Sequence, residues 1–438
     1  MRVVGIIAEY NPFHLGHEYQ IRKARLKWGE DTAIVVVMSG DFVQRGEPAI
    51  ATKISRTKAA LASGADLVLC LPFTFACASA DRFASGAIDT LDATGIVSDI
   101  YFGSECPDIH ILEAIADVWA EEPEEVSLLI TEAMRDGSSY AAARQSSICR
   151  YLANRGNETL AQAAATFLSS PNVILGIEYL ASIRRNNSRM RASLLERKGA
   201  GYHEIDPSSV FPSATALRNI VTNDCAAGVF DISSAALRLQ GKMPDSSLAE
   251  LLTEYSNGCR PVFPSDFTEE ILFAIRRTPV DSLRQTAYMG DCVAERLKNA
   301  VASLPTVETA DLYTTFTSVA STKRFAGTRI NRAIVSLLIG QTTEDIHTIL
   351  HPSYLRVLGF SDIGKYLLRR MRKSSTLPVL DKASDFLEYG DNSQIRRTSE
   401  LDLIAADLRS VKAGQAYGNE FREKVVPYKS KKFKGTDL

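Results

Sequence analysis

The feature that most limits how this chain can fold is the stretch from Val3 to His17, where a short apolar run ends at Asn11-Pro12 and leads into a pair of histidines. The run is too short for a free-standing helix and is rich in β-branched residues, so it predicts a buried first strand. Apolar residues then recur with a helical period, which predicts a helix. His14 and His17 are therefore expected where the first strand ends and the first helix begins.

The two histidines are placed where phosphate groups commonly bind. The first turn of a helix offers unpaired N–H groups and the positive end of the helix dipole. Imidazoles there can donate to phosphate oxygens, and Gly16 lacks the side chain that would keep a triphosphate from the backbone. The alternative is that one histidine caps the helix and the other lies on the surface. Because two of the chain's six histidines fall within four positions, we favour the phosphate site.

Further short runs that read as strands, the first of them rich in β-branched residues, alternate with helical patterns in the first part of the chain. These runs occupy residues 32–39, 66–72, 100–105 and 190–195. Strands that alternate with helices predict βαβ units and an α/β fold with a Rossmann-like parallel sheet. Ligands bind beyond the carboxyl ends of such strands, which here carry His14, Ser39-Gly40, Pro72 and Gly103. The candidate site residues therefore fall on one edge of the predicted sheet.

Two regions are expected outside this alternation. Residues of about 109 to 170 read as helical and are predicted to be an insertion packed beside the sheet, within a catalytic domain spanning residues 1–245. Beyond it, helical patterns follow one another without further strand signals, which predicts an all-α C-terminal domain over residues 246–438.

The second region carries a group of basic residues that suggests RNA binding. On a helix beginning at Thr328, the arginines at 329 and 332 are predicted to face away from the apolar side. The set expected to contact RNA phosphates is Lys323, Arg324, Arg329 and Arg332. The alternative is a solvated helix face. The tail over residues 422–434 is basic with interleaved aromatics, and is either a nucleic-acid arm or a solubilising end.

Composition excludes several classes of protein. At 438 residues and 45% hydrophobic, the chain is expected to form two or three domains. A net charge of −2 means that nucleic acid must be bound by local basic patches. No segment approaches the roughly 20 apolar residues of a membrane span, so a soluble, cytoplasmic protein without a membrane partner is expected. The seven cysteines are scattered and never in C-x-x-C spacing, which supports neither a disulfide framework nor a metal site.

The strings EYNPFHLGH at residues 9–17 and SGDFVQRGEP at residues 39–48 carry a resemblance to known proteins. H-x-G-H at this position resembles the nucleotidyltransferases and class I aminoacyl-tRNA synthetases, in which it holds the α/β-phosphates of the nucleotide. The longer strings resemble the bacterial tRNA(Met) cytidine acetate ligases. The resemblance implies that ATP and acetate form acetyl-adenylate, which acetylates N4 of the wobble cytidine, position 34, of elongator tRNA(Met), releasing AMP and diphosphate. It implies ATP as substrate, with Mg²⁺ expected on its β/γ-phosphates.

The resemblance also assigns roles to residues. His14 and His17 would stabilise the α/β-phosphates, while Arg218 with Ser213 and Thr215 would hold the leaving pyrophosphate; without the resemblance, these last three would read as an ordinary helix cap and a surface arginine. The other residues expected to contact ATP are Ile7, Ala8, Glu9, Tyr10, Asn11, Pro12, Phe13, Gly16, Gly103, Asn172 and Arg197.

The chain departs from the family pattern in two places. Asp41 stands where most members have asparagine, and residues 78–82 replace a Q-S-A-E-D run with Ala-Ser-Ala-Asp-Arg. We expect an added carboxylate beside the nucleotide site to repel phosphate.

Two other functions compete with the ligase. An adenylyltransferase for a small phosphorylated metabolite would use the same histidines, but such enzymes are usually shorter and need no basic helical extension. An RNA-binding protein that keeps the nucleotide fold as a scaffold would have no reason to retain both histidines with Arg197 and Arg218. The sequence leaves the oligomeric state open.

Overall fold

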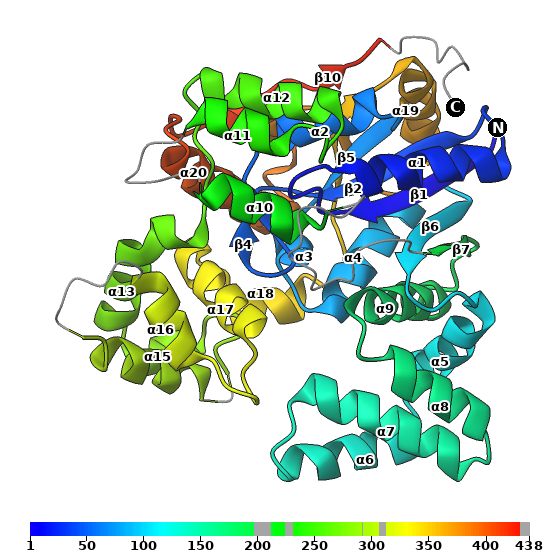
Figure 1. Ribbon diagram of the computed structural model, residues 1–438, viewed down its shortest axis with the longest axis vertical. Helices are drawn as coiled ribbons and strands as arrows, with labels where there is room; N and C mark the ends of the chain where they lie inside the picture. Colours follow the sequence, from blue (N-terminus) through cyan, green and yellow to red (C-terminus); the bar gives the residue numbers. More distant parts are fainter. Residues whose placement is uncertain (197–211, 224–230, 291, 306–311, 430–438) are drawn as a thin grey trace.

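The computed structural model describes residues 1–196, 212–223, 231–290, 292–305 and 312–429, and its centre is a twisted sheet (Figure 1). The strands from the first part of the chain are β1 (Val3–Ala8), β2 (Ala33–Ser39), β5 (Leu67–Leu71), β6 (Asp99–Ser104) and β7 (Arg191–Glu196). They pair in parallel in the order β5-β2-β1-β6-β7. This parallel pairing confirms the predicted Rossmann-like sheet. Each of these strands coincides with an apolar run of the sequence.

The C-terminal part of the chain also contributes to this sheet. β8 (Leu355–Phe360) pairs antiparallel with β5, and both β9 (Val379–Leu380) and β10 (Val426–Pro427) pair with β8. The helices expected beyond residue 245 are present, but the description of that region as all-α is wrong at these strands. An apolar run as short as β8 cannot be distinguished from buried helix by periodicity. The division at residue 245 therefore stays a proposal about folding units, since the sheet itself spans it.

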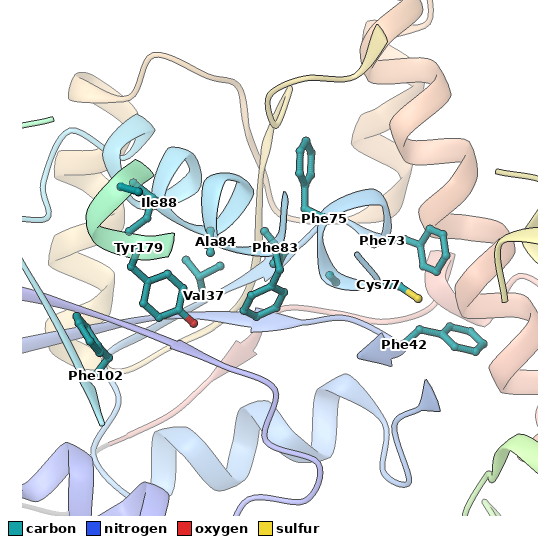
Figure 2. Packing of buried hydrophobic residues seen from close by; sticks show 14 of the residues in the cluster. Val37, Phe42, Phe73, Phe75, Cys77, Phe83, Ala84, Ile88, Phe102 and Tyr179 are labelled. Atoms are coloured by element: carbon teal, nitrogen blue, oxygen red, sulfur yellow. The ribbon is translucent and has the colours of Figure 1, made fainter. Parts of the chain in front are cut away.

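Helices cover both faces of the sheet. On one face lie α1 (Leu15–Trp28) and α2 (Lys53–Ala62), whose apolar residues pack on alternate residues of β1, β2 and β5. On the other lie α4 (Ala80–Ala93), α5 (Ile109–Glu121), α9 (Pro171–Arg185) and α19 (Asp362–Ser374). Figure 2 shows this second core, with Val37 of β2 beside Phe83 and Ile88 of α4, and Phe102 of β6 close to Tyr179 of α9.

The predicted helical insertion is confirmed. After α5 come α6 (Glu124–Arg135), α7 (Tyr140–Asn154) and α8 (Glu158–Phe167), which extend away from the sheet at the bottom of Figure 1. The next helix, α9, begins at Pro171, a residue suited to a first helical position because its missing N–H would have no intrahelical partner there.

The remaining helices form two groups. Near α2 lie α10 (Ala214–Asn223), α11 (Ile232–Leu239) and α12 (Asp245–Ser256). A second group, at the lower left of Figure 1, contains α13 (Thr268–Arg277), α14 (Val280–Arg284), α15 (Val293–Ala302), α16 (Leu312–Ala320), α17 (Gly327–Ile339) and α18 (Thr343–Thr348). The long α20 (Ser393–Lys412) lies between them.

Short elements complete the fold. They are the hairpin of β3 (Phe42–Val43) and β4 (Glu47–Pro48), the helix α3 (Phe73–Ala76), and the 3₁₀ turns η2 (Pro264–Phe267), η3 (Ala383–Tyr389) and η4 (Asn419–Phe421). None of the described helices combines the length and the apolar character that crossing a membrane requires. The described cysteines form no disulfide, and four of them are buried.

A buried cluster of charges joins the start of α2 to the C-terminal end of the chain. Lys53 Nζ lies 2.8 Å from Asp41 Oδ2 and 3.7 Å from Glu423 Oε2, and it also contacts Glu420. Burial by itself would raise the pKa of the Asp41 carboxyl, but Lys53 and Arg409 outweigh it and hold that pKa below its ordinary value. Asp41 is therefore a neutralised partner of Lys53, and the expectation that it repels the nucleotide's phosphates is wrong.

Replacing Lys53 with methionine tests this cluster. The change leaves buried carboxylates without their cation, so we expect the free energy of unfolding to fall by about 3–5 kcal/mol. Lys58→Met is the matched control on the same helix, because the Lys58–Glu250 ion pair is 40% and 31% exposed and should contribute at most about 1 kcal/mol. Urea unfolding at neutral pH measures both, and equal losses would contradict the account.

Candidate active site

A cavity of about 260 Å³ opens at the carboxyl ends of the parallel strands. Its walls come from the ends of β1, β6 and β7, the first turn of α1, the β3–β4 hairpin, and residues of α4, α9 and α10. This is the edge where ligands bind in open α/β sheets, and it is the edge that the sequence predicted.

Most of the predicted site residues meet in this cavity. Those on its walls are Ile7, Ala8, Glu9, His14, Gly16, His17, Gly103, Asn172, Ser213, Thr215 and Arg218. Tyr10, Asn11, Pro12 and Phe13 do not line it but are buried beneath the histidine turn. Arg197 lies outside the described residues.

Backbone N–H groups hold both imidazole rings in place, and in each ring the accepting atom is Nδ1. Gly16 N donates to His14 Nδ1 at 3.1 Å, and His14 N donates to His17 Nδ1 at 3.2 Å, so the pair forms a reciprocal helix cap. The rings stack with centroids 3.7 Å apart and an interplanar angle of 24°. Because Nδ1 accepts a hydrogen bond in each ring, the proton of the neutral imidazole belongs on Nε2. Both histidines line the cavity.

Gly16 is required by this packing. A Cβ at position 16 would lie 2.9 Å from Cε1 and 3.1 Å from Nδ1 of His14, closer than side chains tolerate. The glycine thus allows the His14 ring to fold back over the first turn of α1, as well as leaving the backbone accessible.

The buried residues beneath the turn hold the histidines in place. Rings of Tyr10 and Phe13 pack edge to face at 4.7 Å, and both contact the His17 ring. Asn11 Oδ1 accepts from Ile50 N at 2.9 Å, which links the turn to the segment before α2. These residues were predicted to contact ATP, but the structure places them behind the wall, where they shape it.

Arg218 of α10 also lines the cavity. Its guanidinium donates to Asn11 O at 2.9 Å and to Thr215 Oγ1 at 3.1 Å, and lies 3.7 Å from Glu47 Oε2. Ser213 Oγ accepts from Ala216 N, so it caps the helix as its sequence pattern suggested. Ser213, Thr215 and Arg218 therefore lie on the same cavity as the histidines, and their role toward a leaving pyrophosphate stays a prediction.

Sequence reasoning missed the hairpin wall. Val43, Gln44, Arg45 and Glu47 line the cavity, and Gln44 N donates to Glu9 Oε1 at 2.9 Å. The available signal was the glycine at position 46, which has φ of +75° and closes the tight turn between two short strands.

The sequence also missed the aromatic wall. Phe102 of β6 and Tyr179 of α9 pack edge to face at 5.5 Å, with Phe83 beside them in Figure 2. A Cβ on Gly176 would lie 2.5 Å from Phe102, so this glycine lets α9 approach the ring. Asn172, at the start of α9, donates to Glu105 Oε1 at 2.6 Å. An apolar wall of this kind suits the flat face of a base.

The 78–82 departure lies beside the cavity. Arg82 donates to Thr74 O at 3.0 Å and to Ile346 O at 3.1 Å, and therefore ties α4 to α18. Phe83, the next residue, is on the cavity wall, but none of residues 78–82 is.

The four predicted RNA contacts do not form one exposed stripe. Lys323 and Arg324 are exposed in the loop before α17, and half-buried Arg329 lies over the Phe325 ring. Arg332 instead points inward, where its Nη1 donates to Gln44 O at 3.1 Å and its guanidinium lies over Tyr288. Burial lowers the pKa of Arg332. The prediction is wrong for Arg332, because α17 packs on the hairpin at that position.

The described residues contain no group of three or more histidine, cysteine, aspartate or glutamate side chains that could hold a metal ion.

A parallel sheet with H-x-G-H at its first strand-to-helix turn defines a nucleotidyltransferase, and the sequence model of the HIGH Nucleotidyl Transferase family matches residues 1–424. Among relatives, the tRNA(Met) cytidine acetate ligase of Acetivibrio thermocellus is 36% identical over 433 residues, covering 97% of this chain and 100% of that protein. That of Caldanaerobacter subterraneus subsp. tengcongensis is 33% identical over 411 residues, covering 93% and 94%.

Solved structures agree with the sequence comparison. The crystal structure of Thermotoga maritima TmcAL has a TM-score of 0.90 and 30% identity, covering 98% of this chain and 100% of that one. The same protein bound with alpha-thio ATP has a TM-score of 0.86, with 29% identity and the same coverage. This chain belongs to the HIGH nucleotidyltransferase family and, within it, to the tRNA(Met) cytidine acetate ligases.

The hydrogen bonds of the histidine turn make a spectroscopic prediction. At a pH where both rings are neutral, ¹⁵N-correlated NMR spectra of histidine-labelled protein should show His14 and His17 in the Nε2–H tautomer, because the backbone donates to each Nδ1. Gly16→Ala should change the tautomer or shifts of His14 far more than those of the exposed His110. Finding Nδ1–H in either wild-type ring would contradict the cap geometry.

Proposed function

We propose that this protein is an ATP-dependent tRNA cytidine acetate ligase that acetylates N4 of the wobble cytidine of elongator tRNA(Met), with acetyl-adenylate as intermediate. The observation that carries the proposal is the stacked histidine pair, which lines the same cavity as Arg218, whose guanidinium donates to Asn11 O of the histidine turn. Its relatives bear the name of this activity, and the Thermotoga maritima protein was solved with alpha-thio ATP.

In the first half-reaction, an acetate oxygen attacks the α-phosphorus of ATP and pyrophosphate leaves. Negative charge accumulates on the phosphate oxygens in the transition state, and preorganised donors stabilise it without having to reorient. His14 and His17 supply two such donors at the α/β-phosphates. Arg218, held by Thr215 Oγ1 and Asn11 O, meets the departing pyrophosphate. Mg²⁺ would enter with ATP on its β/γ-phosphates.

In the second half-reaction, the exocyclic amine of the cytidine attacks the acetyl carbonyl and AMP leaves. A base in an anticodon loop can be turned out of its stack to enter the cavity, where the aromatic wall of Phe102 and Tyr179 offers stacking surface. No cysteine or serine nucleophile is needed, because the adenylate already activates the acetyl group.

RNA docking is proposed at the exposed cations near α17. Lys323, Arg324 and Arg329 lie on the helical group that packs against the hairpin wall of the cavity through Arg332. A tRNA held there would have its anticodon loop near the active site. In this proposal residues 1–245 carry the adenylation site, and the helical group beyond them binds tRNA.

The histidines should act mainly on the transition state. We expect His14→Ala and His17→Ala each to slow tRNA-free acetyl-adenylate formation by about 10²- to 10³-fold, while the dissociation constant for ATP changes much less. His110→Ala is the control, since its side chain is 84% exposed on α5. Rapid-quench measurement of adenylate alongside ATP titration separates the two effects, and near-wild-type rates in either variant would remove the catalytic assignment.

The RNA surface can be tested by salt dependence. Replacing Lys323, Arg324 and Arg329 together with alanine should weaken tRNA binding and lower the log–log salt slope by about 2, because each lost phosphate contact accounts for about 0.7. The matched control replaces Lys365, Arg369 and Arg370, three exposed cations on α19. If the α19 variant changes the slope and the α17 variant does not, RNA docks elsewhere than proposed.

A further inference from the structure

Glu9 places a carboxylate in the cavity immediately after β1, and its position needs an explanation. Oε1 accepts from Gln44 N at 2.9 Å, and this hydrogen bond holds the hairpin wall against the end of the strand. Among the residues that the structure describes, Oε2 has no hydrogen-bond partner, although Glu9 lies on the cavity wall. One oxygen is thus used structurally, and the other is available to a bound molecule.

A negative charge is unexpected in a cavity built for phosphates. Desolvation by burial raises the pKa of Glu9, although the hydrogen bond from Gln44 N and the nearby Arg218 and Arg45 oppose that rise. Holding Gln44 N does not require a charge, since a neutral amide oxygen accepts equally well. A carboxylate also repels both acetate and the triphosphate. Its natural ligand in this site is therefore a hydrogen-bond donor.

We propose that Glu9 recognises the exocyclic N4 amine of the acceptor cytosine and takes its proton during acetyl transfer, an inference that rests on the proposed ligase function. A carboxylate accepting from cytosine N4 is a common base-recognition pair. Uridine carries an acceptor oxygen at the same position, so the same carboxylate repels it. Glu9 would therefore contribute to both the chemistry and the choice of cytidine.

The position of Glu9 fits this step. It directly precedes the turn that carries His14 and His17, and it contacts the hairpin on which the RNA-side helix α17 packs. The acceptor base would enter from the hairpin side and meet the acyl phosphate at the histidines. The lone pair on N4 forms the C–N bond to the acetyl carbon, the bond from that carbon to the phosphate oxygen breaks, and AMP leaves with the electron pair. The N–H proton passes to Glu9 and then to water.

Glu9→Gln separates this role from a structural one, because glutamine keeps an oxygen for Gln44 N. We expect acetyl transfer from supplied acetyl-adenylate to tRNA(Met) to slow by about 10²-fold or more, the usual contribution of a general base. The rate of acetyl-adenylate formation without tRNA should fall by a factor that is less than a tenth of the factor for acetyl transfer. Glu47→Gln is the matched control: it removes a second carboxylate that lines the cavity and lies near Arg218, so any effect should fall on adenylate formation.

A second measurement concerns base choice. A tRNA(Met) transcript with uridine at position 34 should inhibit the Glu9→Gln enzyme at lower concentration than it inhibits wild type, because the repelling charge is gone. Equal loss of both half-reactions, or unchanged inhibition by the uridine transcript, would overturn the role of Glu9 and leave it as a nucleotide contact or a hairpin support. If the wild-type enzyme itself makes adenylate but no acetylcytidine, the acceptor assignment in the proposed function fails, and the role of Glu9 fails with it.

Discussion

The active-site edge of the sheet depends on one buried guanidinium. Arg56, on α2, is 2% exposed and donates to Glu9 O and Ser39 O at 2.8 Å each, to Ala51 O at 3.2 Å, and to Gly40 O. It therefore joins the ends of β1 and β2 and satisfies carbonyls that strand pairing leaves open. Desolvation lowers the pKa of Arg56 to about 10, so it remains charged at neutral pH. Arg56 thereby fixes the backbone at Glu9, and the histidine turn continues from that residue.

Residues from the end of the chain complete this framework. Arg409 of α20 donates to Ala49 O at 2.8 Å, and Glu254 of α12 accepts from Thr52 N at 3.0 Å and from Thr52 Oγ1 at 2.8 Å. The segment between the hairpin and α2 is thus held by side chains more than two hundred positions away. β8 also belongs to the sheet, so residues from both parts of the chain hold the catalytic edge in place.

The hairpin is the physical link between the two proposed functions of the molecule. A Cβ on Gly46 would lie 2.4 Å from Arg332 N, so the backbone of α17 rests directly on the turn. On the other side of the same hairpin, Gln44 N holds Glu9. The hairpin thus contacts both the helical group that carries the exposed cations and the residue that lines the cavity after β1.

Local patterns in the sequence predicted the parts of the fold that local physics decides. The β1 run, the histidine turn and the helix cap at Ser213 each depend on neighbouring residues, and the structure contains all three. Sequence patterns did not predict the features that depend on residues distant in the chain. A single short run does not reveal that it will pair with β5, and nothing near Asp41 shows that Lys53 neutralises it.

The same limit applies to the candidate site. The H-x-G-H and Ser213-to-Arg218 patterns identified residues that line the cavity, because each pattern is complete within a few consecutive residues. Helical periodicity predicted that Arg332 would lie on an exposed face and contact RNA. Periodicity carries no information about distant segments, and the hairpin covers that side of α17. The sequence identified Glu9 only as one residue of the 9–17 motif. Its position beside the hairpin is known from the hydrogen bond with Gln44 N.

The central claim is that acetate attacks the α-phosphorus of ATP at the histidine turn. Acetate labelled with ¹⁸O at both oxygens tests it directly when supplied to the protein with ATP and tRNA(Met). If the carboxylate forms an adenylate, the acetyl–oxygen bond breaks during transfer, and mass spectrometry should find one ¹⁸O in the phosphoryl group of the AMP released, in amounts equal to the acetylcytidine formed. AMP without the label, or release of ADP in place of AMP, would contradict this account of the active site.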